Sequence, residues 1–270
     1  MNVYRGCVHG CIYCDSRSSC YQMDHLFEDV AVKIHAPELL ETALSKKRKK
    51  SVLFTGSMSD PYNPYERELE VTRRCLEIIE KYGFGVAPLT KSDLILRDME
   101  LLQRIHHKAR CVVQMTLTTC DEALCRIVEP NVCTTMRRAE VLKAFHQAGI
   151  PTAVWIDPLL PFLNDTRENV QGLLDYCIEA GVKAIVTFRL GLTLRDGDRQ
   201  YFYKQLDKHF PGLKERYIRT YGEAYELPSP REKELQALLE DTCRKAGILF
   251  RPEEAFSWIS SMEEKSLRLF

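Results

Sequence analysis

Short runs of β-branched and apolar residues alternate with longer amphipathic stretches along most of this 270-residue chain. The runs have the length of buried strands, and the stretches between them repeat apolar residues at the i, i+3, i+4 and i+7 spacing of a helix. The predicted strands span 52–55, 85–89, 111–115, 152–156 and 184–188. The predicted helices span 37–45, 67–82, 98–107, 137–148, 167–180 and 198–208. Such alternation with short loops implies parallel strands joined by right-handed crossovers, so we expect an α/β fold.

One more strand at residues 2–5 would complete six strand–helix units. Six units make a partial (β/α)6 barrel of the TIM type, with the active site at the C-terminal ends of the strands. Capping side chains at 164–166 precede one helix, and Gly149 and Gly181 follow two others at positions suited to C-caps.

The stretch 227–230 contains two prolines and separates the barrel from a last helix at about 231–245. We therefore predict a core barrel over residues 1–226 and a C-terminal helical extension over 227–270 that packs on it.

Charge gives the chain no general attraction to polyanions. Lys plus Arg and Asp plus Glu both number 38, so the net charge is zero. No overall field then draws the chain to nucleic acid or to anionic lipid. The one dense basic run, at 46–50, is predicted to be a solvated helix end.

The sequence predicts a cytoplasmic protein without a membrane span. The first residues lack a basic-then-apolar signal pattern, and the most apolar later stretch, 151–163, is interrupted by Asp157 and by prolines. Cytosolic reductants oppose structural disulfides, so most of the eleven cysteines should be free thiols or metal ligands.

Cys7, Cys11 and Cys14 lie in eight residues, directly after the possible first strand. A [4Fe–4S] cluster normally takes four Cys ligands, so three thiolates leave one iron open to a cofactor or substrate. Gly6 and Gly10 suit a loop, 6–20, that curls tightly around sulfur. Cys20 as a fourth ligand would instead make a closed structural site, zinc or iron–sulfur.

The C-x3-C-x2-C run with an aromatic residue before its last Cys resembles the signature of the radical S-adenosylmethionine (radical SAM) superfamily. Further blocks, in order along the chain, are similar to its spore photoproduct lyase-like branch. They are Asn2-Val3-Tyr4-Arg5-Gly6-Cys7, Ser59-Asp60-Pro61-Tyr62-Asn63-Pro64, Thr90-Lys91-Ser92, Thr116-Leu117-Thr118-Thr119, Glu129-Pro130 and Pro161-Phe162-Leu163-Asn164-Asp165.

The resemblance implies an incomplete (β/α)6 barrel and two cofactors, a [4Fe–4S] cluster on Cys7, Cys11 and Cys14 and S-adenosylmethionine. An electron from a flavodoxin or ferredoxin breaks the sulfonium bond, and the 5′-deoxyadenosyl radical abstracts a hydrogen atom from an unidentified substrate. Nucleic acid stays open as that substrate. The competing class is a non-catalytic iron–sulfur or zinc protein.

The resemblance also implies the cofactor contacts. Tyr13 is expected beside the adenine, and Ser59 and Asp60 at the methionine amino group. Lys91 is expected at the methionine carboxylate, and Thr116 near that carboxylate or the ribose.

On the helix after the fourth strand, the resemblance directs Arg138 at the cofactor carboxylate, with Arg137 as the competing choice. Thr118 is a weaker hydroxyl candidate. Asp157 and Arg189, after the fifth and sixth strands, are expected to face the substrate.

Despite the resemblance, we predict that the chain is not a spore photoproduct lyase. In that enzyme a thiol returns a hydrogen atom to the repaired thymine, and the matching position here is Ser57. Cys20 or Cys120 supplying that atom from another loop is the alternative, which keeps a DNA photoproduct lyase-type repair role open. Cys120 and Cys125 follow the fourth strand and could approach the barrel mouth, so an auxiliary cluster or a radical relay on them is a further alternative.

Overall fold

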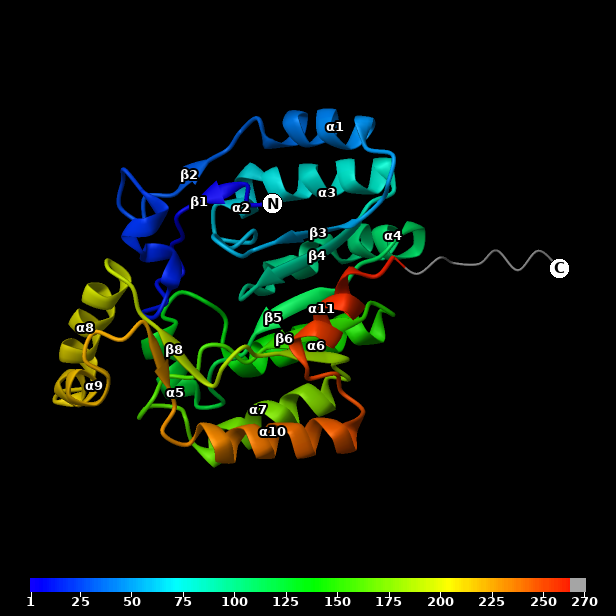
Figure 1. Ribbon diagram of the computed structural model, residues 1–270. Coiled ribbons are helices and arrows are strands. Elements are labelled where there is room, and N and C mark those ends of the chain that lie inside the picture. Colours follow the sequence, from blue (N-terminus) through cyan, green and yellow to red (C-terminus); the bar gives the residue numbers. More distant parts are fainter. Residues whose placement is uncertain (263–270) are drawn as a thin grey trace.

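The computed structural model in Figure 1 describes residues 1–262. Five parallel strands form its central sheet, in the order β3-β4-β5-β6-β7. They are β3 (Val52–Thr55), β4 (Gly85–Thr90), β5 (Val113–Thr116), β6 (Thr152–Trp155) and β7 (Ala184–Val186). Each occupies one of the predicted apolar runs, and the predicted α/β partial barrel is confirmed.

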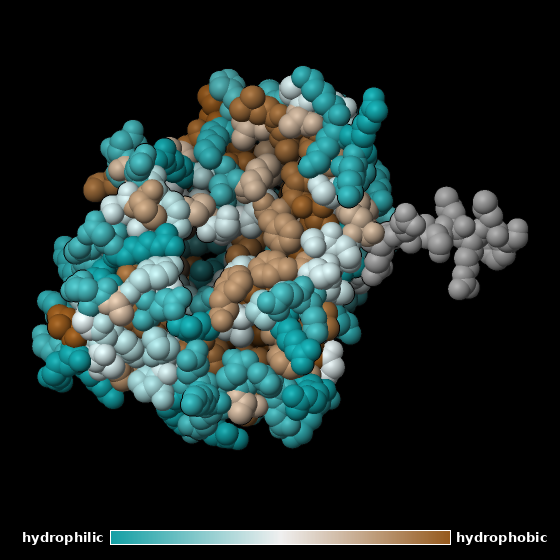
Figure 2. All heavy atoms as spheres, in the orientation of Figure 1, coloured by the Kyte–Doolittle hydropathy of each residue, from teal (hydrophilic) through white to brown (hydrophobic). Residues whose placement is uncertain are grey.

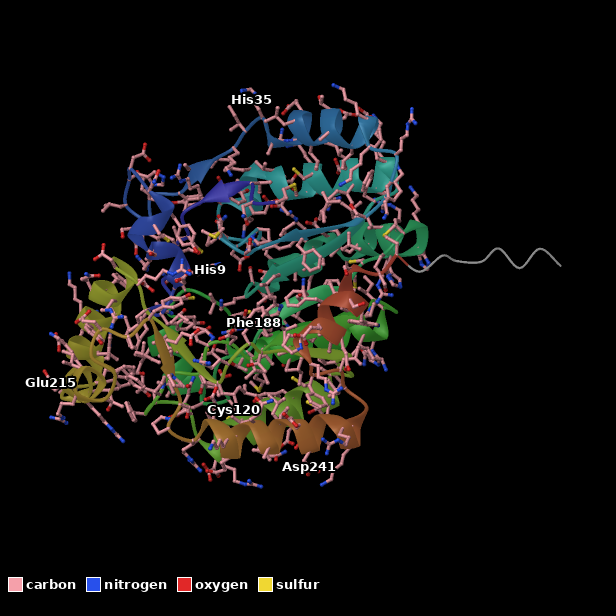
Figure 3. The ribbon with its side chains drawn as sticks, viewed as in Figure 1. His9, His35, Cys120, Phe188, Glu215 and Asp241 are labelled. Atoms are coloured by element: carbon pink, nitrogen blue, oxygen red, sulfur yellow. The ribbon has the colours of Figure 1, made fainter. Side chains whose placement is uncertain are left out.

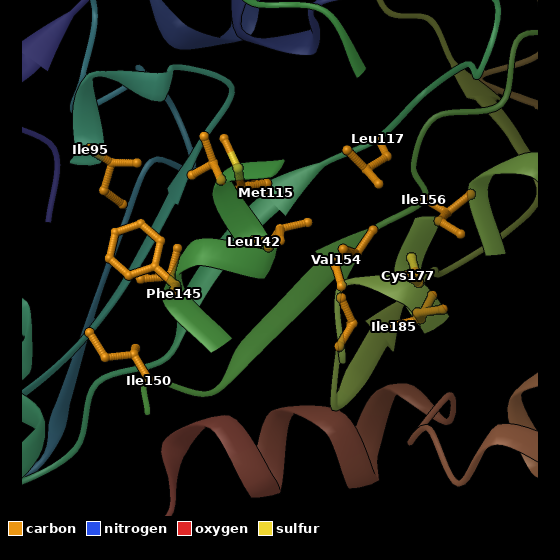
Figure 4. Close-up of a cluster of buried hydrophobic side chains, with 14 of the residues drawn as sticks. Ile95, Met115, Leu117, Leu142, Phe145, Ile150, Val154, Ile156, Cys177 and Ile185 are labelled. Carbon is orange, nitrogen blue, oxygen red and sulfur yellow. The ribbon is translucent and has the colours of Figure 1, made fainter. Parts of the chain in front are cut away.

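Helices cover the outer face of this sheet. The helices up to β7 are α1 (Ala36–Lys46), α2 (Glu66–Leu69), α3 (Val71–Tyr82), α4 (Met99–Lys108), α5 (Glu122–Val128), α6 (Thr135–Gln147) and α7 (Arg167–Glu179). Their apolar faces pack on alternate strand residues such as Met115, Val154 and Ile185, which form one continuous buried core (Figure 4). The connections keep every carboxyl end of the sheet at one edge, where a site can form.

Local signals read from the sequence set several helix ends. The Thr166 hydroxyl accepts a hydrogen bond from the backbone N–H of Asn169 at 3.1 Å, which caps α7. Gly149 and Gly181 follow α6 and α7 with positive φ, as helix C-caps do. The basic run at 46–50 is exposed from the last residue of α1 onward, as predicted.

The N-terminal segment does not supply a sixth parallel strand. β1 (Tyr4–Arg5) pairs antiparallel with β2 (Ala31–Val32) in a separate small sheet. Only two residues are paired because Gly6, with φ of 85°, turns the chain into the cysteine loop at once. The sheet is extended instead at its β7 edge, where Leu249 forms a parallel bridge with Ala184 of β7.

The single helix predicted over 67–82 is two helices. α2 ends and α3 begins around Glu70, whose φ of 50° lies in the left-handed region. The Glu66 carboxylate accepts backbone hydrogen bonds from Thr72 and Arg73 at 2.9 and 3.1 Å, which stabilise this break.

The described chain after β7 packs on both faces of the sheet. It contains β8 (Gly191–Thr193), α8 (Asp198–His209), α9 (Leu213–Tyr221), β9 (Glu226–Pro228), α10 (Glu232–Ala246) and α11 (Pro252–Ser260). α10 lies along α7 (Figure 1), whereas α11 packs through Ala255 and Ile259 on small residues of the other sheet face, among them Ala87 and Ala153.

The division at 226/227 stays a prediction: β9 crosses it and pairs antiparallel with β8. Residues 263–270 of the predicted extension lie outside the described residues. Among the residues that are described, no helix has the length and apolar character needed to span a bilayer.

Candidate active site

The cysteine loop follows β1 and is held by backbone contacts. A Cβ on Gly6 would lie 2.5 Å from the carbonyl oxygen of Phe27, so only glycine fits there. The backbone N–H of Cys7 donates to the same oxygen at 2.9 Å. The Ser59 hydroxyl donates to the Gly6 carbonyl at 2.6 Å. The loop is therefore fixed against the end of β3 before any cofactor binds.

Cys7, Cys11 and Cys14 all line one cavity of about 830 Å³ at the carboxyl edge of the sheet. Figure 2 shows the molecule hollowed at this place. Within residues 1–262, no group of three or more His, Cys, Asp or Glu side chains is placed to hold a metal ion. A zinc ion would need thiolates about 2.3 Å from one centre. Cys7, Cys11 and Cys14 are the cysteines in the described lining of the cavity, and three thiolates are the number that leaves one iron of a [4Fe–4S] cluster without a protein ligand.

His9, inside the same loop, pairs with Asp60. Its Nδ1 lies 3.3 Å from Asp60 Oδ2, and both side chains are largely buried. Asp60 also accepts hydrogen bonds from the Thr90 hydroxyl at 2.6 Å and from the Lys91 backbone N–H at 2.9 Å. Burial opposes ionisation of Asp60, but the His9 charge and these bonds outweigh it and lower the pKa to about 2. Asp60 is therefore ionised, and its carboxylate links His9 of the cysteine loop to Thr90 and Lys91 at the end of β4.

Asp60 also shows the turn-forming role that Asp-Pro sequences favour, because its Oδ1 accepts from the Tyr62 backbone N–H at 2.8 Å. Both Ser59 and Asp60 line the cavity, beside the cysteines. The structure thus brings this pair to the cavity that the three cysteines line, with additional partners that the sequence did not indicate.

The Tyr13 hydroxyl belongs to a buried hydrogen-bond network centred on Glu129. This hydroxyl donates to the Glu129 carboxylate and lies 3.1 Å from the Thr118 hydroxyl. Glu129 forms an ion pair with Arg138, and both side chains are fully buried. Burial raises the pKa of Glu129, but Arg138 and Lys91 outweigh it and bring the pKa down to about 2.

Arg138 is not part of the cavity wall. Its guanidinium donates to the backbone carbonyls of Thr116 at 2.7 Å and Cys133 at 2.9 Å, besides its contact with Glu129. Arg137 is half-exposed and pairs with Asp93 at 3.0 Å. The structure therefore brings neither arginine to the cavity. Arg138 contacts Thr116, which lines the cavity, and it pairs with Glu129, which accepts a hydrogen bond from Tyr13 of the lining.

Lys91 follows β4 and lines the cavity together with Thr116, at the end of β5. Its Nζ lies 5.8 Å from the centre of the Tyr13 ring. Burial lowers the pKa of Lys91, but the nearby Cys11 and Glu129 outweigh it, so the pKa is raised above its usual value. A charged ammonium thus stands beside the thiols.

Four aromatic side chains also line the cavity. Phe54, Trp155 and Phe188 come from three strand ends, and Phe256 comes from α11. Asp157 and Arg189, which follow the strands β6 and β7, line the same cavity, and Arg189 pairs with Glu226. Phe256 was missed because its helix lies in the extension, and only the tertiary fold brings it here.

The other cysteines stand apart from the cavity lining. All eleven are free thiols. Cys20 is exposed and contacts Arg195 Nη1 at 3.3 Å, and Cys125 is buried against Arg138 Nη2 at 3.3 Å. Cys120 packs near Gly172 on α7. In residues 1–262 the pair Cys120 and Cys125 is not part of any metal-binding group.

Comparisons with known proteins agree with this geometry. Residues 1–177 match the family model of the Radical SAM superfamily. The chain is 29% identical over 239 residues to the uncharacterized protein Rv2578c of Mycobacterium tuberculosis, with 86% of this chain and 70% of that protein covered. It is 32% identical over 169 residues to the uncharacterized protein MJ0683 of Methanocaldococcus jannaschii, with 62% of each covered.

Solved structures share the fold. Spore photoproduct lyase complexed with dinucleoside spore photoproduct gives a TM-score of 0.64 at 13% identity, over 92% of this chain and 74% of that one. A serine-for-cysteine mutant of spore photoproduct lyase gives 0.66 at 15% identity with the same coverage.

The family match spans more than half of the chain and contains all three loop cysteines. The chain therefore belongs to the radical SAM superfamily: it is an enzyme that uses a [4Fe–4S] cluster to cleave S-adenosylmethionine reductively, with an electron from an external donor, and abstracts a hydrogen atom from its substrate.

Proposed function

We propose that Cys7, Cys11 and Cys14 hold the cluster, and that the adjoining part of the same cavity binds S-adenosylmethionine and then an organic substrate. The observation that carries this proposal is that the three thiols, Lys91 and Tyr13 line one cavity. The cavity lies at the carboxyl ends of the strands, where barrels of this class carry out their chemistry.

Lys91 meets the methionine carboxylate in this proposal, since it brings a cation to the thiol side of the cavity without forming an ion pair within residues 1–262. Tyr13 lies beside the adenine and Thr116 beside the carboxylate or ribose. Ser59 and Asp60 face the methionine amino group. Arg138 acts as a positioning residue, because its bonds to Thr116 and Glu129 fix the wall that faces the cofactor.

When bound, the two cofactors supply a 5′-deoxyadenosyl radical. The chain's own residues then hold the substrate hydrogen near the radical and exclude water and competing hydrogens. The electron donor is a flavodoxin or a ferredoxin, and the enzyme works in the cytoplasm, where eleven free thiols stay reduced. The reaction class is lyase-like or oxidoreductase-like.

The direct test is anaerobic reconstitution. About four irons and four sulfides per chain are expected, with a spectrum that changes when S-adenosylmethionine is added, because one iron lacks a protein ligand. Dithionite should then yield methionine and 5′-deoxyadenosine. A metal site with four protein ligands, whose spectrum does not change when S-adenosylmethionine is added, would instead show that the chain is a non-catalytic iron–sulfur or zinc protein.

Lys91→Met is expected to weaken S-adenosylmethionine binding about 10- to 100-fold. Loss of one charge-assisted contact costs roughly 1–3 kcal/mol, and each 1.4 kcal/mol is about tenfold. Equilibrium dialysis of the reconstituted protein measures the affinity. Lys143→Met is the matched control, because Lys143 is exposed and pairs with Glu179 at 2.8 Å on the outer helices. Equal affinities in the two variants would remove Lys91 from the cofactor site.

Clean multiple turnover of dinucleoside spore photoproduct is not expected. Ser57, which the resemblance puts at the position of the hydrogen-donating thiol, lines the cavity, and neither Cys20 nor Cys120 lines it. A hydroxyl O–H is much stronger than a thiol S–H and does not readily quench a carbon radical. Mass spectrometry of the products, with Ser57→Cys as the matched variant, measures this. Repair by the unaltered chain would restore the DNA photoproduct lyase assignment.

A further inference from the structure

Four aromatic side chains of the cavity lining, Phe54, Trp155, Phe188 and Phe256, form a packed wall. Trp155 meets Phe188 and Phe256 edge-on, each at 5.8 Å between ring centres. Phe188 stacks on Phe256 at 5.9 Å, and Phe54 lies 6.3 Å from Phe256. The Phe188 side chain is 63% exposed, so the wall offers ring surface rather than a closed core.

The indole of Trp155 is held in place before any ligand arrives. Its Nε1–H donates to the Gln114 side-chain carbonyl at 2.9 Å, and the Gln114 amide donates to the Ala87 carbonyl at 3.0 Å. A ring fixed by such a chain presents the same face to every ligand, which lowers the entropy lost on binding.

Asp157 lies two residues beyond Trp155 at the end of β6 and lines the same cavity. Within residues 1–262, no side-chain hydrogen bond or ion pair reaches its carboxyl group; only the backbone N–H of Phe188 favours its charged form. Burial outweighs this N–H and raises the pKa of Asp157 to about 7.

The other acids of the cavity already have partners. Asp60 faces His9, Glu226 faces Arg189, and Asp15 lies 3.5 Å from Arg195. Asp157 is therefore the acid in the described cavity lining that lacks a cation. Among the cations of the described cavity lining, Lys91 likewise has no ion pair, and the proposed function assigns it to the cofactor carboxylate.

We propose that Asp157 and the aromatic wall of Phe54, Trp155, Phe188 and Phe256 bind a cationic amine of the substrate, an alkylammonium or quaternary ammonium group. A cation is attracted to the faces of aromatic rings and neutralises the half-buried carboxylate, whereas a neutral planar ligand would leave that carboxylate without a partner. The proposal rests on the proposed function for the role of the cavity, and it names the substrate class.

Binding of the cation is linked to proton release from Asp157. Because the pKa of Asp157 is raised to about 7, the ligand-free group is mostly protonated at pH 6 and mostly ionised at pH 8. Affinity for a cation should then rise roughly tenfold between these two pH values. The other charged groups that face this cavity are His9, Asp15, Asp60, Lys91, Arg189 and Glu226.

The test uses the reconstituted enzyme with S-adenosylmethionine and without reductant. Labelled choline is the probe, and its neutral carbon isostere, 3,3-dimethylbutan-1-ol, is the competitor. Choline should bind in equilibrium dialysis about tenfold more tightly at pH 8 than at pH 6, and the isostere should not displace it at equal concentration. Asp157→Asn should weaken choline binding at least tenfold and remove the pH dependence.

Asp241→Asn is the matched control, because Asp241 lies on the outer helix α10, away from Phe188 (Figure 3), and pairs with Lys245 at 2.6 Å. It should leave choline binding unchanged. Displacement by the isostere, or equal choline affinity at pH 6 and pH 8, would overturn the proposal, and neither measurement requires a variant.

Loss of S-adenosylmethionine affinity in Asp157→Asn with choline binding unchanged would place Asp157 at the cofactor instead and also overturn it. Failure of the proposed function shows separately, as absence of 5′-deoxyadenosine from the unaltered enzyme.

Discussion

Cys11→Ala is expected to lose the cluster and all 5′-deoxyadenosine formation, the largest effect of any single change in this protein. The same result is expected for Cys7→Ala and Cys14→Ala, because two thiolates are too few to hold a cluster that already leaves one iron open. Iron and sulfide content after anaerobic reconstitution, and chromatography of the dithionite-reduced reaction, measure the two losses.

Cys20→Ala provides the matched control, since Cys20 belongs to the same loop but is exposed and points to Arg195. It should keep the iron content and the cleavage of S-adenosylmethionine largely intact. Retained cleavage in Cys11→Ala would end the assignment of the three-cysteine site. Loss of the cluster in Cys20→Ala would show that a fourth thiol closes it.

The sheet and the position of the site were predictable from the sequence because each depends on local pattern. Buried parallel strands require continuous apolar runs, and these mark β3 to β7. Residues that directly follow such runs, among them Ser59, Lys91 and Asp157, must gather at one edge of the sheet, and all three line the cavity.

Arg138 could not be placed in this way. It lies inside α6, and the direction of a helical side chain depends on what the helix packs against. Its ion-pair partner, Glu129, belongs to the Glu129-Pro130 block, but no sequence pattern assigned a role to that carboxylate. His9 was likewise visible between two cysteines, and only the fold shows that it meets Asp60. Long-range pairing of this kind leaves no periodic signal in one sequence.

Glu129→Ala is expected to reduce the free energy of unfolding by about 3–5 kcal/mol, because it leaves a buried guanidinium without its counter-ion. The same change removes the acceptor for the Tyr13 and Thr118 hydroxyls. Urea unfolding of the cluster-free protein under reducing conditions measures the loss. Glu140→Ala, which breaks the exposed pair with Arg137 at 2.9 Å, should cost less than about 1 kcal/mol.

The pair should also show in the pH dependence of stability. Arg138 lowers the pKa of Glu129 from 4.5 to about 2 despite burial, so its contribution is complete above the unfolded pKa and is lost as the pH falls toward 2. Glu129→Ala should therefore flatten the acid limb of the stability curve, which Glu140→Ala should leave unchanged.

Replacing both partners, Glu129→Ala with Arg138→Met, should recover much of the lost stability, because no buried charge then remains unpaired. If the double variant were as unstable as Glu129→Ala alone, the penalty would come from the Tyr13 and Thr118 hydroxyls rather than from the guanidinium. The Tyr13 wall of the cavity would then depend on the carboxylate itself, whatever its partner.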